Sequence, residues 1–142
     1  MAWRRKIDAA TPLLDEAYLE RLGAALGGPA LAELLADGMI ELEDRLSRLE
    51  VLARSGDREA AAALCHDIVA VAGHMGLGAL SAAAAALNRR LRSPRRVVRQ
   101  RGAPQAIPGD ADLPRLVSGV TALGAPSMRA LSARTGVGST RG

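Results

Sequence analysis

Aromatic residues are nearly absent from this 142-residue sequence, which contains no Phe and only Trp3 and Tyr18. Proteins that bind single-stranded nucleic acid commonly stack bases on aromatic side chains, so this scarcity argues against a nucleic-acid partner. The apolar residues are mostly Ala and Leu, and β-branched residues form few of the runs that are typical of strands. We therefore expect an all-α fold.

Cysteine and long apolar runs are also scarce. Cys65 is the single cysteine, so no internal disulfide can form, which fits a reducing compartment. The longest apolar run, around residues 82–87, is far shorter than the roughly 18 residues that span a bilayer. The basic start is followed by Asp8 and polar residues, where a signal peptide needs an apolar stretch. These features predict a cytoplasmic protein with no membrane partner.

The formal net charge of +4 conceals an uneven distribution. Residues 1–88 hold eight Lys or Arg against thirteen Asp or Glu, whereas residues 89–142 hold eleven Arg against two Asp. Seven of these arginines fall between Arg89 and Arg101, and Gly, Pro and Gln follow. We interpret this segment as a solvated connection or a disordered insert.

Leucine and alanine recur at helical spacing through most of the chain. The clearest helix lies between Pro29 and Ser55, with these apolar residues three or four positions apart: Leu31, Leu35, Met39, Leu42, Leu46, Leu49 and Ala53. Capping and turn residues predict a short helix before it, over residues 15–26, and two after it, over about 57–72 and 77–91. A last helix is expected from Asp112. Pro126 breaks or kinks it and leaves a final turn or two at residues 127–133.

The predicted architecture is an up-and-down four-helix bundle with an extra short N-terminal helix, over residues 13–133. An arm of residues 1–12 precedes the bundle. The Arg-, Pro- and Gly-rich insert interrupts it at about residues 93–110, and residues 134–142 are expected to form a disordered tail.

His66 has an unusual predicted position on the third of these helices. At about 100° per residue, Leu64, Ile68 and Ala72 share the stripe that faces the core, and His66 falls near the opposite side. Its expected neighbours on the outer surface are small or apolar, where a helix in water normally carries Lys, Glu or Gln: Ala62, Ala63, Val69, Ala70 and Gly73. Short side chains around a projecting nucleophile suit a transfer reaction in which a partner must bring its reacting group to within about 3–3.5 Å.

The segment from Cys65 to Leu80, CHDIVAVAGHMGLGAL in one-letter code, resembles the signature of histidine-containing phosphotransfer (HPt) domains, approximately AHxLKGSAxxLGxxxL. His66 matches the phospho-accepting histidine, and the register has no gap. Ile68 and Met75 replace Leu in the signature, and Gly76 and Leu80 match outright. The resemblance covers about residues 13–92, with residues 112–132 as the last bundle helix.

The resemblance implies a phosphocarrier in a bacterial-type phosphorelay rather than an enzyme. His66 would accept a phosphoryl group from a receiver-domain aspartate and pass it to another receiver domain. The receiver domain of a hybrid kinase or response regulator would supply Mg²⁺, so no cofactor is expected here, and we expect a monomer. The outer small residues, including Ala62, Ala63, Val69, Ala70 and Gly73, would form the docking face.

The sequence departs from the family at two positions, with Val69 in place of the usual Lys and Ala70 in place of the usual Gly. These departures leave open a docking adaptor with a degenerate HPt fold. The arginine run leaves open an Arg-rich nucleic-acid-binding helical protein. Cys65 and His66 are adjacent and about 100° apart on the helix, which argues against a metal site.

Overall fold

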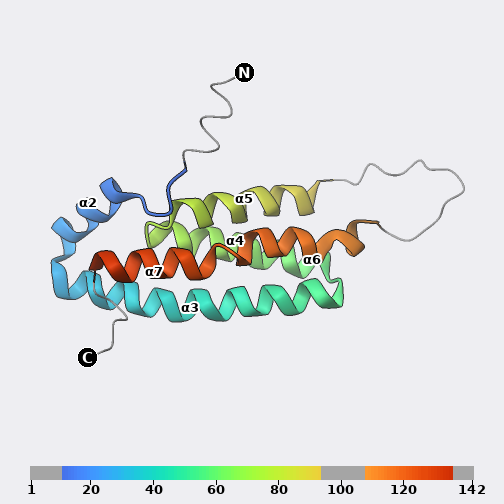
Figure 1. Ribbon diagram of the computed structural model, residues 1–142, viewed down its shortest axis with the longest axis horizontal. Helices are drawn as coiled ribbons and strands as arrows, with labels where there is room; N and C mark the ends of the chain where they lie inside the picture. The colour runs from blue at the N-terminus through green and yellow to red at the C-terminus, as the bar shows by residue number, and fades with distance from the viewer. Residues whose placement is uncertain (1–10, 94–107, 136–142) are drawn as a thin grey trace, which may run out of the picture.

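The computed structural model describes residues 11–93 and 108–135 and shows α-helices, with no strand in those ranges (Figure 1). The helices in chain order are α2 (Glu16–Leu26), α3 (Gly28–Ser55), α4 (Arg58–His74), α5 (Gly78–Arg92), α6 (Pro108–Thr121) and α7 (Gly124–Thr135). The prediction of an all-α protein is therefore confirmed for the described residues. Most of the insert, and all but two residues of the N-terminal arm, lie outside them.

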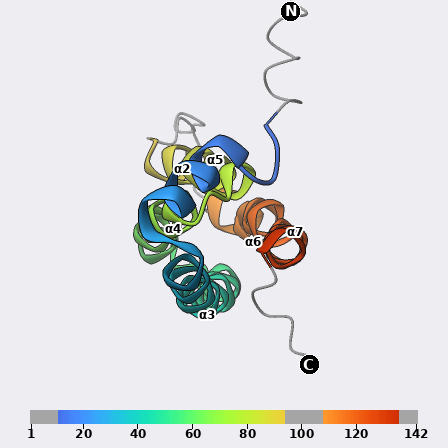
Figure 2. The same cartoon turned by 90° about the vertical axis from the view of Figure 1, so that its left-hand side faces the viewer.

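The helices pack around a single leucine-rich core. Contacts link α3 to α4, α4 to α5, α5 to α6, and α6 back to α3, so these helices surround the core (Figure 2). The core contains the leucines predicted from the long helix, together with apolar residues of the other helices and of the turn before α5: Leu19, Ile68, Leu77, Leu80, Leu87, Leu113, Val117 and Leu131. The periodicity of the sequence therefore identified the buried side of α3.

Side-chain caps set the beginnings of two helices as the sequence indicates. Asp15 directly precedes α2, and its carboxylate accepts a hydrogen bond from the backbone N–H of Tyr18 at 3.1 Å. The Asp57 carboxylate accepts from the backbone N–H of Ala60 at 3.0 Å at the start of α4. Such caps satisfy backbone donors that a helix start leaves unpaired. Gly56, at φ 75°, closes α3 immediately before this cap.

The C-terminal helices differ from the prediction in length. The last bundle helix begins at Pro108 rather than Asp112, and α7 is a 12-residue helix rather than a final turn or two. The interruption falls at residues 122 and 123, because the ring of Pro126 would clash with the carbonyl of Ala122 in a continuous helix. Pro126 itself lies in the first turn of α7, where a missing N–H costs no intrahelical hydrogen bond. Helix α7 also extends to Thr135, inside the range that was predicted as tail.

Candidate functional site

His66 is the central residue of α4, eight positions from each end of the helix. The side chains that α4 buries against the core are on the other side of the helix: Ala61, Leu64, Cys65, Ile68 and Ala72. His66 and its neighbour Asp67 are exposed. The prediction that His66 projects into solvent from the middle of a helix is therefore confirmed.

The exposed residues around His66 form what we call the outer face of α4, defined by Glu59, Ala63, His66, Asp67, Ala70, Gly73 and His74. Ala63 lies about one turn before His66, Ala70 about one turn after it, and Gly73 about two turns after it. These three small residues were predicted to lie on this surface, and they do. Little side-chain bulk therefore stands beside the imidazole.

Two other residues of the predicted docking face lie elsewhere. Ala62 is only 2% exposed, and Val69 is half-buried and packs against the core. Both lie on the flank of α4 that is covered by α5. The Asn88 side chain donates to the carbonyl of Ala62 at 2.7 Å, and the Ser81 hydroxyl donates to the carbonyl of Val69 at 3.1 Å. The placement of Ala62 on the exposed face was wrong, because helical phase alone did not reveal how far α5 covers this flank.

Helix α5 contributes exposed residues beside the outer face of α4. Ser81 and Asn88 face α4, and Leu80, Ala84, Leu87 and Leu91 face the core. Ala82, Ala86 and Arg89 are exposed. Sequence reasoning missed this contribution, since the spacing within one helix does not give its register against a neighbour.

The C-terminal end of α4 is held by hydrogen bonds from α2 and from the residue that caps α2. The Tyr18 hydroxyl donates to the carbonyl of His74 at 2.9 Å, and the N–H of Asp15 donates to the carbonyl of Gly76 at 2.8 Å. Gly76 has a φ of 75°, and a Cβ there would come within 2.8 Å of Leu19. The turn after α4 therefore requires glycine both for its backbone conformation and for the close approach of α2.

Cys65 is adjacent to His66 in sequence but points into the core. It is fully buried, and burial raises the pKa of its thiol from 9.0 to about 11. A thiol in this state is uncharged near neutral pH and unsuited to act as a nucleophile or metal ligand. Among the described residues, no three His, Cys, Asp or Glu side chains are grouped so that they could hold a metal ion.

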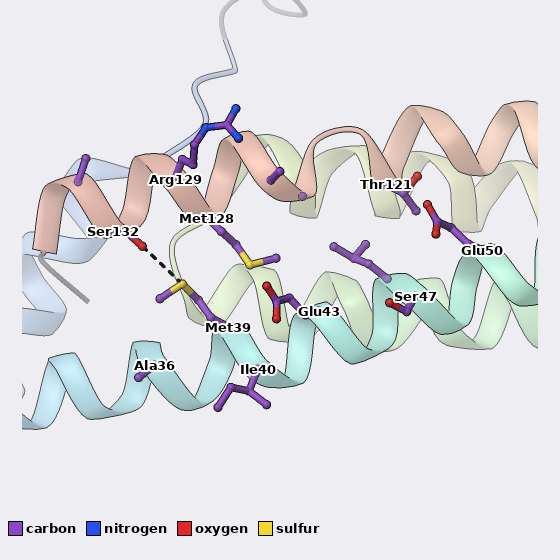
Figure 3. Close-up of a pocket in the computed structure, with 14 residues that line it drawn as sticks. Ala36, Met39, Ile40, Glu43, Ser47, Glu50, Thr121, Met128, Arg129 and Ser132 are labelled. Carbon is purple, nitrogen blue, oxygen red and sulfur yellow. Dashed lines mark hydrogen bonds between the residues drawn. The ribbon is translucent and has the colours of Figure 1, made fainter. Parts of the chain in front are cut away.

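An open groove of about 1090 Å³ lies between α3 and the α6–α7 segment, and no residue of α4 lines it (Figure 3). Its apolar lining includes Met39, Leu46 and Met128, and Glu43 and Glu50 add negative charge along α3. The Ser132 hydroxyl points across the groove to the sulfur of Met39, at 4.0 Å. The groove contains none of the predicted site residues and is separate from the outer face of α4.

No family model, no curated protein and no solved structure matches this chain. None of the helices in residues 11–93 and 108–135 combines the length and the apolar character needed to cross a membrane.

Proposed function

We propose that this protein is a phosphocarrier of the HPt type that carries a phosphoryl group on His66. The observation that supports this most directly is the placement of His66, which is exposed at the centre of a well-anchored helix and is flanked by Ala63, Ala70 and Gly73. A partner domain can approach the imidazole closely over these short side chains. The resemblance of residues 65–80 to the HPt signature supports phosphoryl transfer as the reaction of this site.

The same proposal specifies the architecture. Helices α3, α4 and α5 would be three members of an up-and-down four-helix bundle, and α6 with α7 would be the fourth, interrupted at residues 122–123. Helix α2 would be the additional N-terminal helix. The contacts that link these members in a ring support this arrangement.

The proposed reaction is a reversible transfer between His66 and a receiver-domain aspartate. The lone pair of one imidazole nitrogen forms a bond to phosphorus, and the bond between phosphorus and the aspartyl oxygen breaks. The aspartate leaves as a carboxylate with the electron pair of that bond, and the other imidazole nitrogen keeps its proton. Transfer to a second receiver is the reverse of these steps. Positioning and charge neutralisation supply most of the catalysis in such transfers.

The catalytic groups would come from the partner. The receiver would bring Mg²⁺ and its acidic pocket, and this protein would present the nucleophile without being an enzyme itself. The sequence contains no glycine-rich P-loop motif for ATP, so we propose that the phosphoryl group arrives from another protein. We further propose that the carrier acts as a cytoplasmic monomer, with Ala63, Ala70 and Gly73 as the docking face around His66.

The proposal is tested by incubating the protein with phosphorylated receiver domains and Mg²⁺. Label that is acid-labile and alkali-stable should appear on the wild type and disappear in His66→Gln. A matched His74→Gln variant should be labelled like the wild type, because His74 lies at the end of α4. Absence of label with several active receivers would reject the carrier. Binding of those receivers without label would support the docking adaptor instead, and salt-sensitive DNA or RNA binding would support the Arg-rich alternative.

A further inference from the structure

A phosphoryl group on His66 would lack a nearby positive partner on its own helix, because Arg58 lies eight residues away and its guanidinium donates to the carbonyl of Arg90. Where the HPt signature has Lys, this chain has Val69, which is half-buried on the flank that faces α5. The outer face of α4 carries Glu59 and Asp67, both of which would repel a phosphoryl group. A cation of this protein that contacts phospho-His66 would therefore come from another helix.

Three side-chain hydrogen bonds join α4 and α5, and the two that flank the level of His66 show how the helices align. Asn88 donates to the carbonyl of Ala62, and Ser81 donates to the carbonyl of Val69. The donors are seven residues apart on α5, and the acceptors are seven residues apart on α4 in the opposite order. The helices are therefore antiparallel, and Ala84 and Ala85 lie at the level of His66. Arg89 lies five residues beyond Ala84, about 7.5 Å or 1.4 helical turns further along α5.

The direction of the two side chains brings them closer still. In any α-helix, the Cα–Cβ bonds tilt toward the N-terminus. Because the helices are antiparallel, this tilt moves the Arg89 side chain toward the level of His66, and it moves the His66 side chain toward the level of Arg89. The long, flexible arginine stem can cover the remaining distance along the helix axis.

Arg89 also points to the correct side of α5. It follows Asn88, which faces α4, by about 100°, and it is turned away from the core side that holds Leu87 and Leu91. It is exposed, and no ion pair with another described residue occupies its guanidinium. Arg90 is a further 100° around the helix and points away from α4.

We propose that Arg89 supplies the cation for phospho-His66, in place of the lysine that the family carries on the helix of the histidine. The guanidinium would donate charge-assisted hydrogen bonds to the phosphoryl oxygens across the α4–α5 boundary. This inference rests on the proposed function and adds a phosphoryl-binding residue to it. Arg90 provides a matched control on the same helix.

The test uses phosphoramidate, a small donor that labels histidine without a receiver domain. Wild type, Arg89→Gln, Arg89→Lys and Arg90→Gln are compared, with His66→Gln used to subtract label on His74. We expect Arg89→Gln to take up label about fivefold more slowly. A change in rate of this size is what the loss of one exposed ion pair would produce. Arg90→Gln should match the wild type, and Arg89→Lys should recover most of the rate. Raising the salt concentration should reduce the difference.

A second readout separates a phosphate contact from a general structural effect. In ³¹P NMR titrations, Arg89→Gln should raise the pKa of the phosphoryl group by about 0.5, and Arg90→Gln should leave that pKa unchanged. Equal behaviour of the two glutamine variants in both measurements would overturn the role of Arg89 while leaving the carrier proposal intact. Failure of receiver domains to label the wild type would instead reject the carrier proposal itself.

Discussion

The side-chain amide of Asn88 donates a hydrogen bond of 2.7 Å to the backbone carbonyl of Ala62, joining α5 to the N-terminal half of α4. The contact is half-buried and lies one turn before His66. It is one of three side-chain hydrogen bonds that join α4 to α5.

Asn88→Ala should therefore destabilise the protein by about 1 kcal/mol, the usual net value of one such hydrogen bond. Urea unfolding followed by circular dichroism measures this change. Ser93→Ala is the control, because its hydroxyl bonds only within α5, to Arg89, and its loss should change the stability far less. Equal losses in the two variants would show that the Asn88 contact adds nothing across the helices.

Gly76→Ala should be among the most damaging single-methyl changes in the chain. The new Cβ would meet Leu19 at 2.8 Å, and the φ of 75° is strained for any L side chain. We expect a loss of about 2 kcal/mol or more in the free energy of unfolding.

Gly73→Ala is the matched control on the same helix end. Its Cβ would lie 3.6 Å from the Ser81 hydroxyl, an ordinary contact. Alanine has the higher helix propensity, so this variant should be as stable as the wild type or up to about 1 kcal/mol more stable. A Gly76→Ala protein as stable as Gly73→Ala would contradict the packing of α2 on this turn.

Ala70→Trp should block receiver docking without removing the nucleophile. The indole would stand about one turn from His66 on the outer face of α4 and hold a partner away from the imidazole. A displacement of about 1 Å can slow such a reaction roughly 100-fold, so receiver-dependent labelling should fall by at least that factor.

Labelling of Ala70→Trp by phosphoramidate should remain within a few-fold of the wild type, because that donor is small. Val51→Trp, on the exposed side of α3, should leave both reactions unchanged. Normal receiver transfer in Ala70→Trp would mean that receivers do not approach over this surface.

The buried thiol of Cys65 predicts a loss of stability in alkaline solution. Its pKa is raised by burial from 9.0 to about 11, so between these values the thiol ionises in the unfolded chain but not in the native protein. Stability that is fully present below pH 9 is therefore lost as the pH rises to 11, by up to about 2 kcal/mol.

Urea unfolding of wild type and Cys65→Ala at pH 8 and pH 10.5 isolates this contribution. The stability of the wild type should fall more than that of the variant, which has no thiol to titrate. The same thiol should react with iodoacetamide slowly in the native protein and rapidly in urea. Parallel pH profiles for the two proteins would contradict the burial of Cys65.

Much of this fold follows from local signals in the sequence. Asp15 and Asp57 are capping residues directly before helices, and the leucines of α3 recur at the helical period, so the elements and their buried sides were predictable. The orientation of His66 followed from the same period. The position of each helix, its buried side and the orientation of His66 each depend on the residues of a single helix.

The surroundings of His66 depend on two helices and were only partly predictable. The phase of α4 separates core from solvent, but it does not show that α5 covers Ala62. The position of Arg89 beside the outer face depends on the alignment set by Asn88 and Ser81, which no spacing within α5 reveals. The length of α7 was also missed, because Pro126 was expected to break or kink the helix and leave only a final turn or two, whereas proline is well tolerated in a first helical turn.

The central position of His66 on α4 has a consequence for the encounter with a partner. Both ends of the helix are anchored, by the Asp57 cap at one end and by Tyr18 and Asp15 at the other. The backbone of the histidine is therefore ordered when the protein folds, and two side-chain torsions are all that remain to be restricted at each collision. Most of the conformational entropy of the imidazole is therefore lost during folding rather than at each encounter, which would suit the proposed carrier if it meets different receivers in turn.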